Sequence, residues 1–130
     1  MKKVMIIEDC KGLQFGYRMS LRDEVNLVQA HTLAEATRLF EEHDGKFDII
    51  TFDGKLDSDE SPFPEFTFKL IEDIRAIYGG IMVGASSDPK MRQDQFDLGC
   101  NYIIEEKNLL PKKVLEIIEE LKLQELAGNA

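Results

Sequence analysis

The sequence contains little cysteine, proline and glycine, and it has no long hydrophobic run. Its two cysteines, Cys10 and Cys100, lie far apart and fit neither a zinc-binding nor a redox-active spacing. Four prolines and nine glycines in 130 residues are too few for a collagen-like or a disordered chain. No apolar run approaches the length of a membrane span, and the run at 4–7 is too short for a signal peptide. These absences predict a single globular domain in a reducing compartment, which we expect to be the cytoplasm.

Positive charge is also scarce. The chain has 16 Lys and Arg against 25 Asp and Glu, which gives a net charge of −9 at pH 7. Proteins that bind nucleic acid need clustered Lys and Arg to meet the phosphate backbone. We therefore expect neither a nucleic acid nor a membrane among the partners of this protein.

Short apolar runs alternate with amphipathic stretches along the whole chain. The apolar runs predict five strands, at residues 3–7, 26–30, 47–52, 81–85 and 101–104. The spacing of apolar and capping residues predicts five helices, at 12–21, 32–44, 63–77, 88–99 and from Pro111 onward. Alternation of this kind is typical of an α/β fold with a parallel sheet. We expect a single, doubly wound, five-stranded parallel sheet with about five helices, in a flavodoxin-like arrangement.

One stretch differs in composition from the rest. Residues 53–61 are polar, and the acidic residues at 57–60 predict a solvated loop. The apolar residues of the helix predicted after it are Phe63, Phe66, Leu70, Ile74 and Ile77. Their spacings of three and four predict a helix whose apolar face packs in the core. We assign residues 1–124 to the domain and residues 125–130 to a short C-terminal tail, with no output domain.

Polar residues follow the predicted strands. They are Glu8 and Asp9 after the first strand, Asp53 after the third, Ser86 after the fourth and Lys107 after the fifth. The carboxyl ends of parallel strands form one edge of a doubly wound sheet, so we expect these side chains to meet there. Mg²⁺, a hard cation that prefers oxygen ligands, would relieve the repulsion among three carboxylates. Asp53 would then attack a phosphorus centre, while the metal, Lys107 and Ser86 neutralise the developing charge.

Five segments, in order and at similar intervals, resemble the receiver domain of two-component response regulators. They are residues 6–9, 47–53, 82–87, 99–102 and 106–111, and Ala30 and Glu35-Ala36 also match the pattern after the second strand. The resemblance covers nearly the whole chain. It implies a signalling domain that takes a phosphoryl group from a histidine kinase or a histidine phosphotransfer protein. Such a receiver catalyses only its own phosphorylation and dephosphorylation, and it acts through contacts with an output protein, here unidentified.

The resemblance also implies roles for individual residues. Asp53 would accept the phosphoryl group. The ligands of Mg²⁺ would be Glu8, through water, Asp9, Asp53 and the backbone carbonyl of Lys55. Lys107 and Ser86 would move toward the phosphoryl group, and Tyr102 would reorient with Ser86 as part of a switch. The side chain of Lys55 would pair with the bound phosphate or with a loop carboxylate.

The sequence departs from the family pattern at the lysine, in the loop after the third strand and in the helix between Asp88 and Gly99, which is shorter than usual. Counting forward from Gly99 puts Glu106 at the lysine position. Counting from Tyr102 puts Glu105 there, whereas the residues that follow favour Lys107. The loop after the third strand lacks the family's Pro and Gly and is rich in acids. These departures favour an alternative interpretation, a pseudo-receiver that keeps the fold as an interaction module without being phosphorylated.

A third interpretation is a metal-dependent phosphotransfer or nuclease-type enzyme that resembles Toprim domains. Such an enzyme would use Glu8 together with an Asp-x-Asp pair. Asp53-Gly54-Lys55 breaks that pair at the expected strand end, whereas Asp57-Ser58-Asp59 contains one in another place. The third interpretation is therefore the least favoured of the three.

Overall fold

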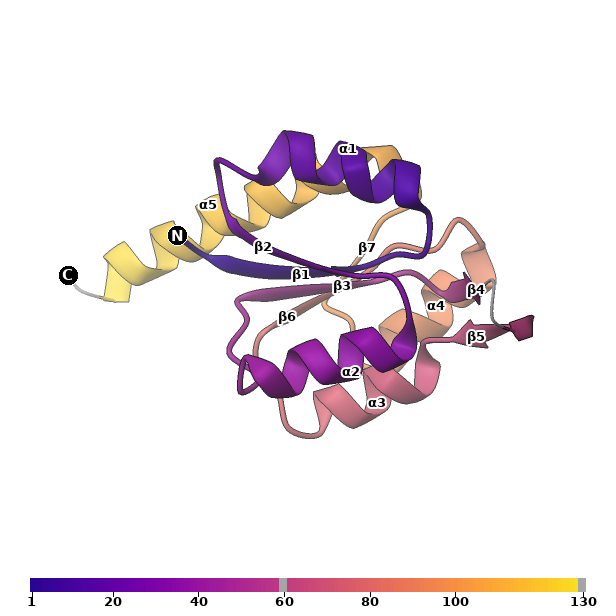
Figure 1. Cartoon of the computed structure of the whole chain (residues 1–130). Helices are drawn as coiled ribbons and strands as arrows, with labels where there is room; N and C mark the ends of the chain where they lie inside the picture. The colour runs from indigo at the N-terminus through magenta and orange to yellow at the C-terminus, as the bar shows by residue number, and fades with distance from the viewer. Residues whose placement is uncertain (59–60, 129–130) are drawn as a thin grey trace.

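The fold is built on a five-stranded parallel sheet. In the computed structural model, which describes residues 1–58 and 61–128, the strand order is β2-β1-β3-β6-β7 (Figure 1). The strands are β1 (Lys3–Ile7), β2 (Asn26–Ala30), β3 (Ile49–Phe52), β6 (Ile81–Gly84) and β7 (Tyr102–Ile103). Every neighbouring pair is parallel. The predicted fold class, with one doubly wound five-stranded sheet, is therefore confirmed.

Helices cover both faces of the sheet (Figure 1). Helices α1 (Lys11–Leu21) and α5 (Leu110–Gly128) lie over one face. The other face is covered by α2 (Leu33–Glu42), α3 (Phe68–Arg75) and α4 (Pro89–Asp97). A short 3₁₀ helix, η1 (Lys107–Leu109), leads into α5. Because the strands all run the same way, their carboxyl ends meet at one edge, on the right in Figure 1.

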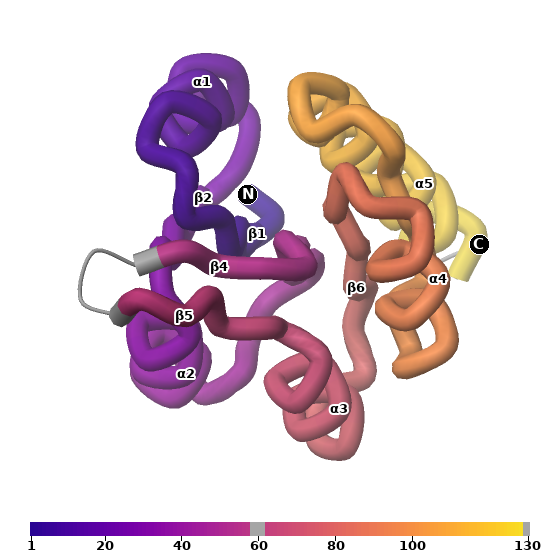
Figure 2. Tube along the Cα trace, turned by 90° about the vertical axis from the view of Figure 1, so that its right-hand side faces the viewer, coloured from indigo at the N-terminus to yellow at the C-terminus, as the bar shows by residue number. Residues whose placement is uncertain are grey.

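The segment after β3 differs from the prediction. Instead of a polar loop and a long helix, the chain forms an antiparallel hairpin of β4 (Lys55–Ser58) and β5 (Ser61–Phe66). Figure 2 looks onto this hairpin, which lies at the same edge as the strand ends. Of the residues predicted as an acidic loop, Asp57 belongs to β4, while Asp59 and Glu60 lie outside the described residues.

The apolar face predicted for residues 63–77 is only partly in the core. Its exposed members are Phe63 at 75%, Phe66 at 46% and Ile77 at 77%, so the prediction was wrong for these three. Pro62 and Pro64 explain the error at Phe63 and Phe66, because proline lacks an amide donor and disfavours helical backbone in the preceding residue. The helix therefore begins only at Phe68, after both prolines. Ile77 lies beyond the end of α3 at Arg75.

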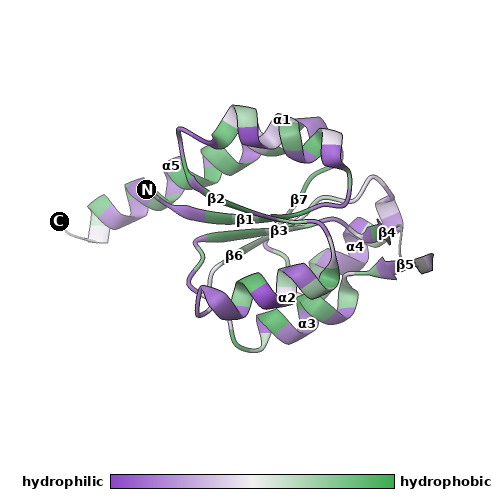
Figure 3. Ribbon diagram, viewed as in Figure 1, coloured by the Kyte–Doolittle hydropathy of each residue, from purple (hydrophilic) through white to green (hydrophobic). Residues whose placement is uncertain are grey.

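The central strands β1, β3 and β6 are buried on both sides, which explains their continuous apolar sequences. Val4 and Ile6 of β1 pack in the cluster with α1 and α5, whereas Met5 and Ile7 pack in the cluster with α2 and α3. All four side chains are at most 1% exposed. Figure 3 shows the same pattern, with hydrophobic colour along the sheet and on the helices beside it. The sheet is therefore a fixed platform for the polar residues that follow each strand.

Other differences from the prediction concern the ends of elements. β3 begins at Ile49 rather than at residue 47, and β7 covers only two residues of the predicted 101–104. α5 continues to Gly128, so the tail predicted at 125–130 begins as helix. No helix among the residues that the structure describes is long and apolar enough to cross a membrane.

Candidate functional site

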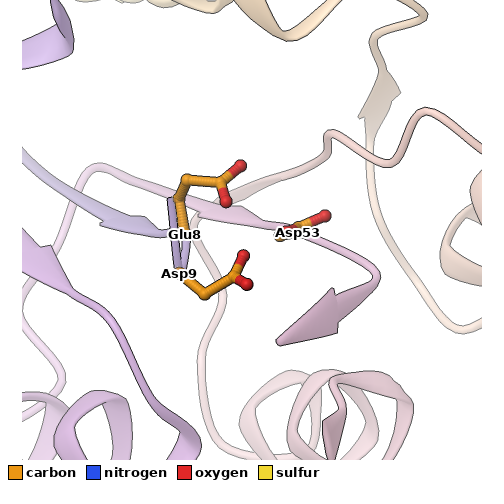
Figure 4. Close-up of side chains that lie close together, drawn as sticks. All are labelled: Glu8, Asp9 and Asp53. Carbon is orange, nitrogen blue, oxygen red and sulfur yellow. The ribbon is translucent and has the colours of Figure 1, made fainter. Parts of the chain in front are cut away.

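Three carboxylates meet at the carboxyl edge of the sheet. β1 and β3 are neighbours with Ile7 opposite Phe52, so the residues that follow these strands lie side by side. One carboxylate oxygen each from Glu8, Asp9 and Asp53 lies within 4.8 Å of the other two. Figure 4 shows Glu8 and Asp9 after β1 with Asp53 beside them. These three residues are called the acidic cluster below.

A lysine side chain joins the acidic cluster. The Nζ atom of Lys107 lies 2.9 Å from Asp53 Oδ1 and 3.0 Å from Glu8 Oε1. Among the three residues that the sequence left open for the lysine position, Glu105 and Glu106 are exposed and Lys107 alone contacts the cluster. The first residue of η1 thus supplies the cluster with a positive charge.

Asp53 is held by backbone and side-chain hydrogen bonds. Its side chain is almost fully buried, and its Oδ1 accepts a hydrogen bond of 2.8 Å from the amide of Gly54. The hydroxyl of Thr67, just before α3, donates to the backbone carbonyl of Asp53 at 2.5 Å. The carboxylate of Asp53 is therefore fixed in place at the end of β3.

The two residues after β1 are held in different ways. Glu8 is buried, and its Oε2 accepts a hydrogen bond of 3.0 Å from the amide of Cys10. The Oδ2 atom of Asp9 accepts a hydrogen bond of 2.9 Å from the amide of Asp57 in β4. The β4–β5 hairpin is thereby connected to the acidic cluster.

Burial and charge shift the protonation of these groups. Burial raises the pKa of Glu8 to about 8, the hydrogen bond with Asp9 and the charge of Asp53 add to this, and Lys107 opposes it. Burial also raises the pKa of Asp53, although Lys107 favours its ionised form. For Lys107, burial lowers the pKa, but hydrogen bonding and attraction to Asp53 and Glu8 outweigh burial and raise it. The surroundings therefore disfavour full ionisation of Glu8 and Asp53 together.

The donor set of the cluster fits a hard divalent cation. All three side chains offer carboxylate oxygens, which are the ligands that such cations prefer. Burial opposes ionisation of Asp9, but its hydrogen bonds from Glu8 and the Asp57 amide outweigh burial and lower its pKa. Asp9 is therefore the most readily ionised ligand of the three.

A cavity of about 310 Å³ opens beside the cluster. Its lining includes Asp9, Asp53, Lys55, Asp57, Ser86, Ser87, Asp88, Met91 and Lys107. The hydroxyl of Ser86 is buried, accepts a hydrogen bond of 3.1 Å from the Asp88 amide and lies 3.6 Å from Met91 Sδ. A Cβ atom at Gly54 would lie 2.9 Å from Ser86 Oγ, so only glycine permits this close approach. Most of the predicted site residues therefore share one cavity.

Tyr102 is the predicted site residue that lies elsewhere. Its hydroxyl donates a hydrogen bond of 2.9 Å to Glu120 Oε2 on α5. The ammonium of Lys113 lies 4.6 Å from the centre of its ring. The side chain of Tyr102 is therefore held against α5 rather than beside the acidic cluster.

Sequence reasoning missed three residues that support the site. Tyr17 on α1 is buried and donates a hydrogen bond of 2.7 Å to the backbone carbonyl of Lys107. Gln14 lies one turn earlier on α1. Its Nε2 donates hydrogen bonds to the backbone carbonyls of Ile6, Glu8 and Ala30. Thr67 is the third, through its bond to Asp53. For Gln14 and Tyr17, the helical spacing with Leu21 could have indicated that they lie on the buried face of α1.

Comparisons with known proteins agree with this fold. No model of a known protein family matches the sequence, and no curated protein matches it. Solved structures, however, match nearly the whole chain. A response regulator receiver domain protein (CheY-like) from Methanospirillum hungatei JF-1 has a TM-score of 0.76 and 20% sequence identity, covering 100% of this chain and 99% of that one.

Two further structures show the same likeness. A two-component response regulator from Clostridium difficile has a TM-score of 0.74 at 18% identity and covers 93% of this chain and 98% of its own. A response regulator from Burkholderia pseudomallei, with a phosphorylated aspartic acid, a calcium ion and citrate, has a TM-score of 0.73 at 18% identity. It covers 100% of this chain and 76% of its own. At such identities the likeness establishes the fold, which is that of response regulator receiver domains.

Proposed function

We propose that this chain is a receiver domain that accepts a phosphoryl group on Asp53 in the presence of Mg²⁺. The donor would be a histidine kinase or a histidine phosphotransfer protein. The observation that carries the proposal is the acidic cluster with Lys107, 2.9 Å from Asp53, beside an open cavity. A nucleophile, a cation site and a fixed positive charge are the groups that phosphoryl transfer to a carboxylate requires.

In the proposed reaction, a carboxylate oxygen of Asp53 attacks the phosphorus atom of a phosphohistidine. The O–P bond forms as the P–N bond breaks, and the leaving imidazole keeps the electron pair and takes up a proton. Bound Mg²⁺ would supply positive charge to the phosphoryl oxygens. Lys107 would balance the charge of the product, and the Ser86 hydroxyl would give up its present contacts to donate to a phosphoryl oxygen.

The metal would be held by the acidic cluster. Asp9 and Asp53 would bind Mg²⁺ directly, Glu8 would act through water, and the backbone carbonyl of Lys55 would complete the set. The similar response regulator from Burkholderia pseudomallei contains a phosphorylated aspartic acid and a calcium ion. This pairing supports the same combination of phosphoaspartate and divalent cation here.

Output would pass through a protein partner. Phosphorylation adds a charge of roughly −1.5 to −2 to a site that is already acidic. Movement of Ser86 and Lys107 toward that charge would change the relative populations of two conformations of the surface near Tyr102. Tyr102 is held by an exposed contact to Glu120, which permits such a rearrangement.

One observation favours the alternative, a pseudo-receiver that is not phosphorylated. The β4–β5 hairpin replaces the loop after Asp53, and the Asp57 amide occupies an oxygen of Asp9. An Asp9 oxygen that accepts this bond has fewer lone pairs for a metal. The chain would then act as an interaction module with an unmodified surface.

Incubation with acetyl phosphate and Mg²⁺, followed by intact-mass measurement, tests the proposal. We expect the wild type to gain the mass of one phosphate, and Asp53→Asn to gain none. Mg²⁺ alone should also raise the melting temperature of the wild type, because a ligand that binds only the folded state stabilises it. A folded wild type with no mass gain and no response to Mg²⁺ would overturn the proposal and favour the pseudo-receiver.

A further inference from the structure

A second concave surface lies between α2 and α3, away from the acidic cluster. A cavity of about 400 Å³ is lined by residues of both helices and of the turns that follow them. Gly45 at one end comes just before β3, and Ile77 comes just before β6. This end of the cavity therefore lies toward the amino edge of the sheet, opposite to the carboxyl edge that carries the cluster (Figure 1). The cavity is called the α2–α3 groove below.

The floor of the groove is apolar. Leu70, Ile74 and Ile77 follow one another at spacings of four and three, and they form a single ridge along α3 and past its end. Ile74 is buried, Leu70 is half-buried and Ile77 is 77% exposed, so the ridge runs from the core into solvent. An apolar ridge of this spacing is what an amphipathic helix presents to a partner helix.

The opposite wall of the groove is rigid. The ring of Phe40 on α2 stacks with Phe47 at 6.3 Å between centroids and meets Tyr78 edge-on at 6.2 Å. Gly45, with a φ of 65°, lies so close that a Cβ atom there would be 2.9 Å from Phe40. A wall fixed in this way loses little entropy when a ligand binds.

The charged residues that line the groove are all acidic. They are Glu41, Asp44 and Asp73. Among the described residues, Glu41 and Asp44 form no ion pair. Asp73 has only Lys69 on the same helix, in an exposed pair that contributes little. An apolar floor beside unpaired carboxylates fits a ligand with an apolar ridge and flanking positive charges.

We propose that the α2–α3 groove binds an amphipathic helical segment of another protein, with apolar residues on one face and Lys or Arg beside them. The apolar face would pack on Leu70, Ile74 and Ile77, and the cations would meet Glu41 and Asp44. The net charge of −9 would also steer a basic segment toward the chain. A second copy of this chain fits less well, because a two-fold contact would bring two acidic rims together. The groove would anchor its partner whether or not Asp53 is modified.

Titration of the ¹⁵N-labelled chain with a synthetic helical peptide tests this proposal. The peptide consists of leucine and lysine, with leucines at i, i+4 and i+7, and a scrambled peptide of the same composition is its control. We expect chemical-shift changes at Phe40, Gly45 and Ile74, none at Asp53, and an affinity that falls as salt is added. Equal binding of the scrambled peptide, or shift changes centred elsewhere, would overturn the proposal.

Matched variants distinguish binding of the peptide in the groove from its general attraction to an acidic protein. Ile77→Ser should weaken binding by about tenfold or more, whereas Leu123→Ser, at a 64% exposed position on α5, should not change it. Glu41→Gln should weaken binding, while Glu119→Gln on α5 should leave it unchanged. Asp53→Asn should bind as the wild type does, so this test does not depend on the proposed phosphorylation.

Self-association is the remaining outcome to distinguish. Sedimentation of the wild type over a range of concentrations should show a monomer. A dimer that Ile77→Ser abolishes would mean that a second copy covers the groove, and it would overturn the proposal of a basic partner. Wild-type affinity for the helical peptide in Ile77→Ser would overturn it as well.

Discussion

Tyr17 acts on the acidic cluster without touching its carboxylates. Its buried hydroxyl holds the backbone of Lys107, and the Lys107 side chain in turn contacts Glu8 and Asp53. Burial raises the pKa of the Tyr17 hydroxyl, so it remains a proton donor at neutral pH. The position of the lysine thus depends on a residue from the first helix.

Removal of the Tyr17 hydroxyl tests this dependence. We predict that Tyr17→Phe lowers the free energy of unfolding by about 1 kcal/mol, because a buried hydrogen bond is lost. The matched control is Tyr102→Phe, whose hydroxyl bonds Glu120 at the surface and whose loss should change stability by less than about 0.5 kcal/mol. Urea denaturation of both variants measures the difference. Equal effects would contradict the structural role of Tyr17.

Lys55 provides a second prediction at this scale. Its side chain lines the cavity beside Asp53 and Asp57. An ammonium that pairs with a bound phosphoryl group changes how readily water attacks it, so Lys55→Ala should alter the lifetime of phosphorylated Asp53. The lifetime is measured by intact mass after the phosphate donor is removed, with Lys46→Ala, outside the cavity, as the control. Identical lifetimes in Lys55→Ala and wild type would contradict this role.

The strand pattern alone predicted the positions of the acidic residues, whereas for the lysine it left three candidates open and only the residues that follow favoured Lys107. Glu8 and Asp53 come directly after buried strands, and the parallel sheet alone brings such ends together. Lys107 follows an exposed turn, whose length no apolar pattern determines, and it is the first residue of the 3₁₀ helix η1. Counting from Gly99 or Tyr102 therefore fails, because the path between β7 and α5 depends on contacts such as the one with Tyr17.

At the scale of elements, local sequence patterns predicted the structure correctly where several of them agreed. Thr32 and Glu35 have capping-box spacing in the sequence, and in the structure Thr32 Oγ1 accepts a hydrogen bond of 3.1 Å from the Glu35 amide. In the segment that forms the β4–β5 hairpin, the sequence patterns conflict. The spacing of Phe63 and Phe66 favours a helix, whereas two prolines disfavour one. The prolines prevail because a helix through them would lose backbone hydrogen bonds.

The turn that ends α2 offers a prediction for an element. Gly45 has a φ of 65° and lies against the ring of Phe40, so Gly45→Ala adds both backbone strain and a clash. We expect a loss of about 1–2 kcal/mol in the free energy of unfolding. Gly79→Ala is the control, because nothing lies within 4 Å of a Cβ atom there. Urea midpoints that shift equally for both variants would show that the turn tolerates a side chain.

At the scale of the whole molecule, the two cysteines report on the integrity of the fold. Cys100 is 2% exposed, and burial raises the pKa of its thiol to about 12, whereas Cys10 is exposed. We predict that iodoacetamide at pH 8 labels Cys10 alone in the folded protein, because the thiolate is the reactive form. Intact mass should show a second label only when urea unfolds the chain. In Cys10→Ser, rapid labelling of the folded protein would contradict this prediction.

The acidic cluster and the lysine beside it come from distant parts of the chain, with Glu8 near the start and Lys107 after all five strands of the sheet. During synthesis on the ribosome, Glu8 and Asp53 emerge long before the lysine that neutralises them. A partly made chain can therefore pair β1 with β3 only by bringing unbalanced carboxylates together. Completion of the site and completion of the fold then coincide, so unfinished chains would not present the assembled site.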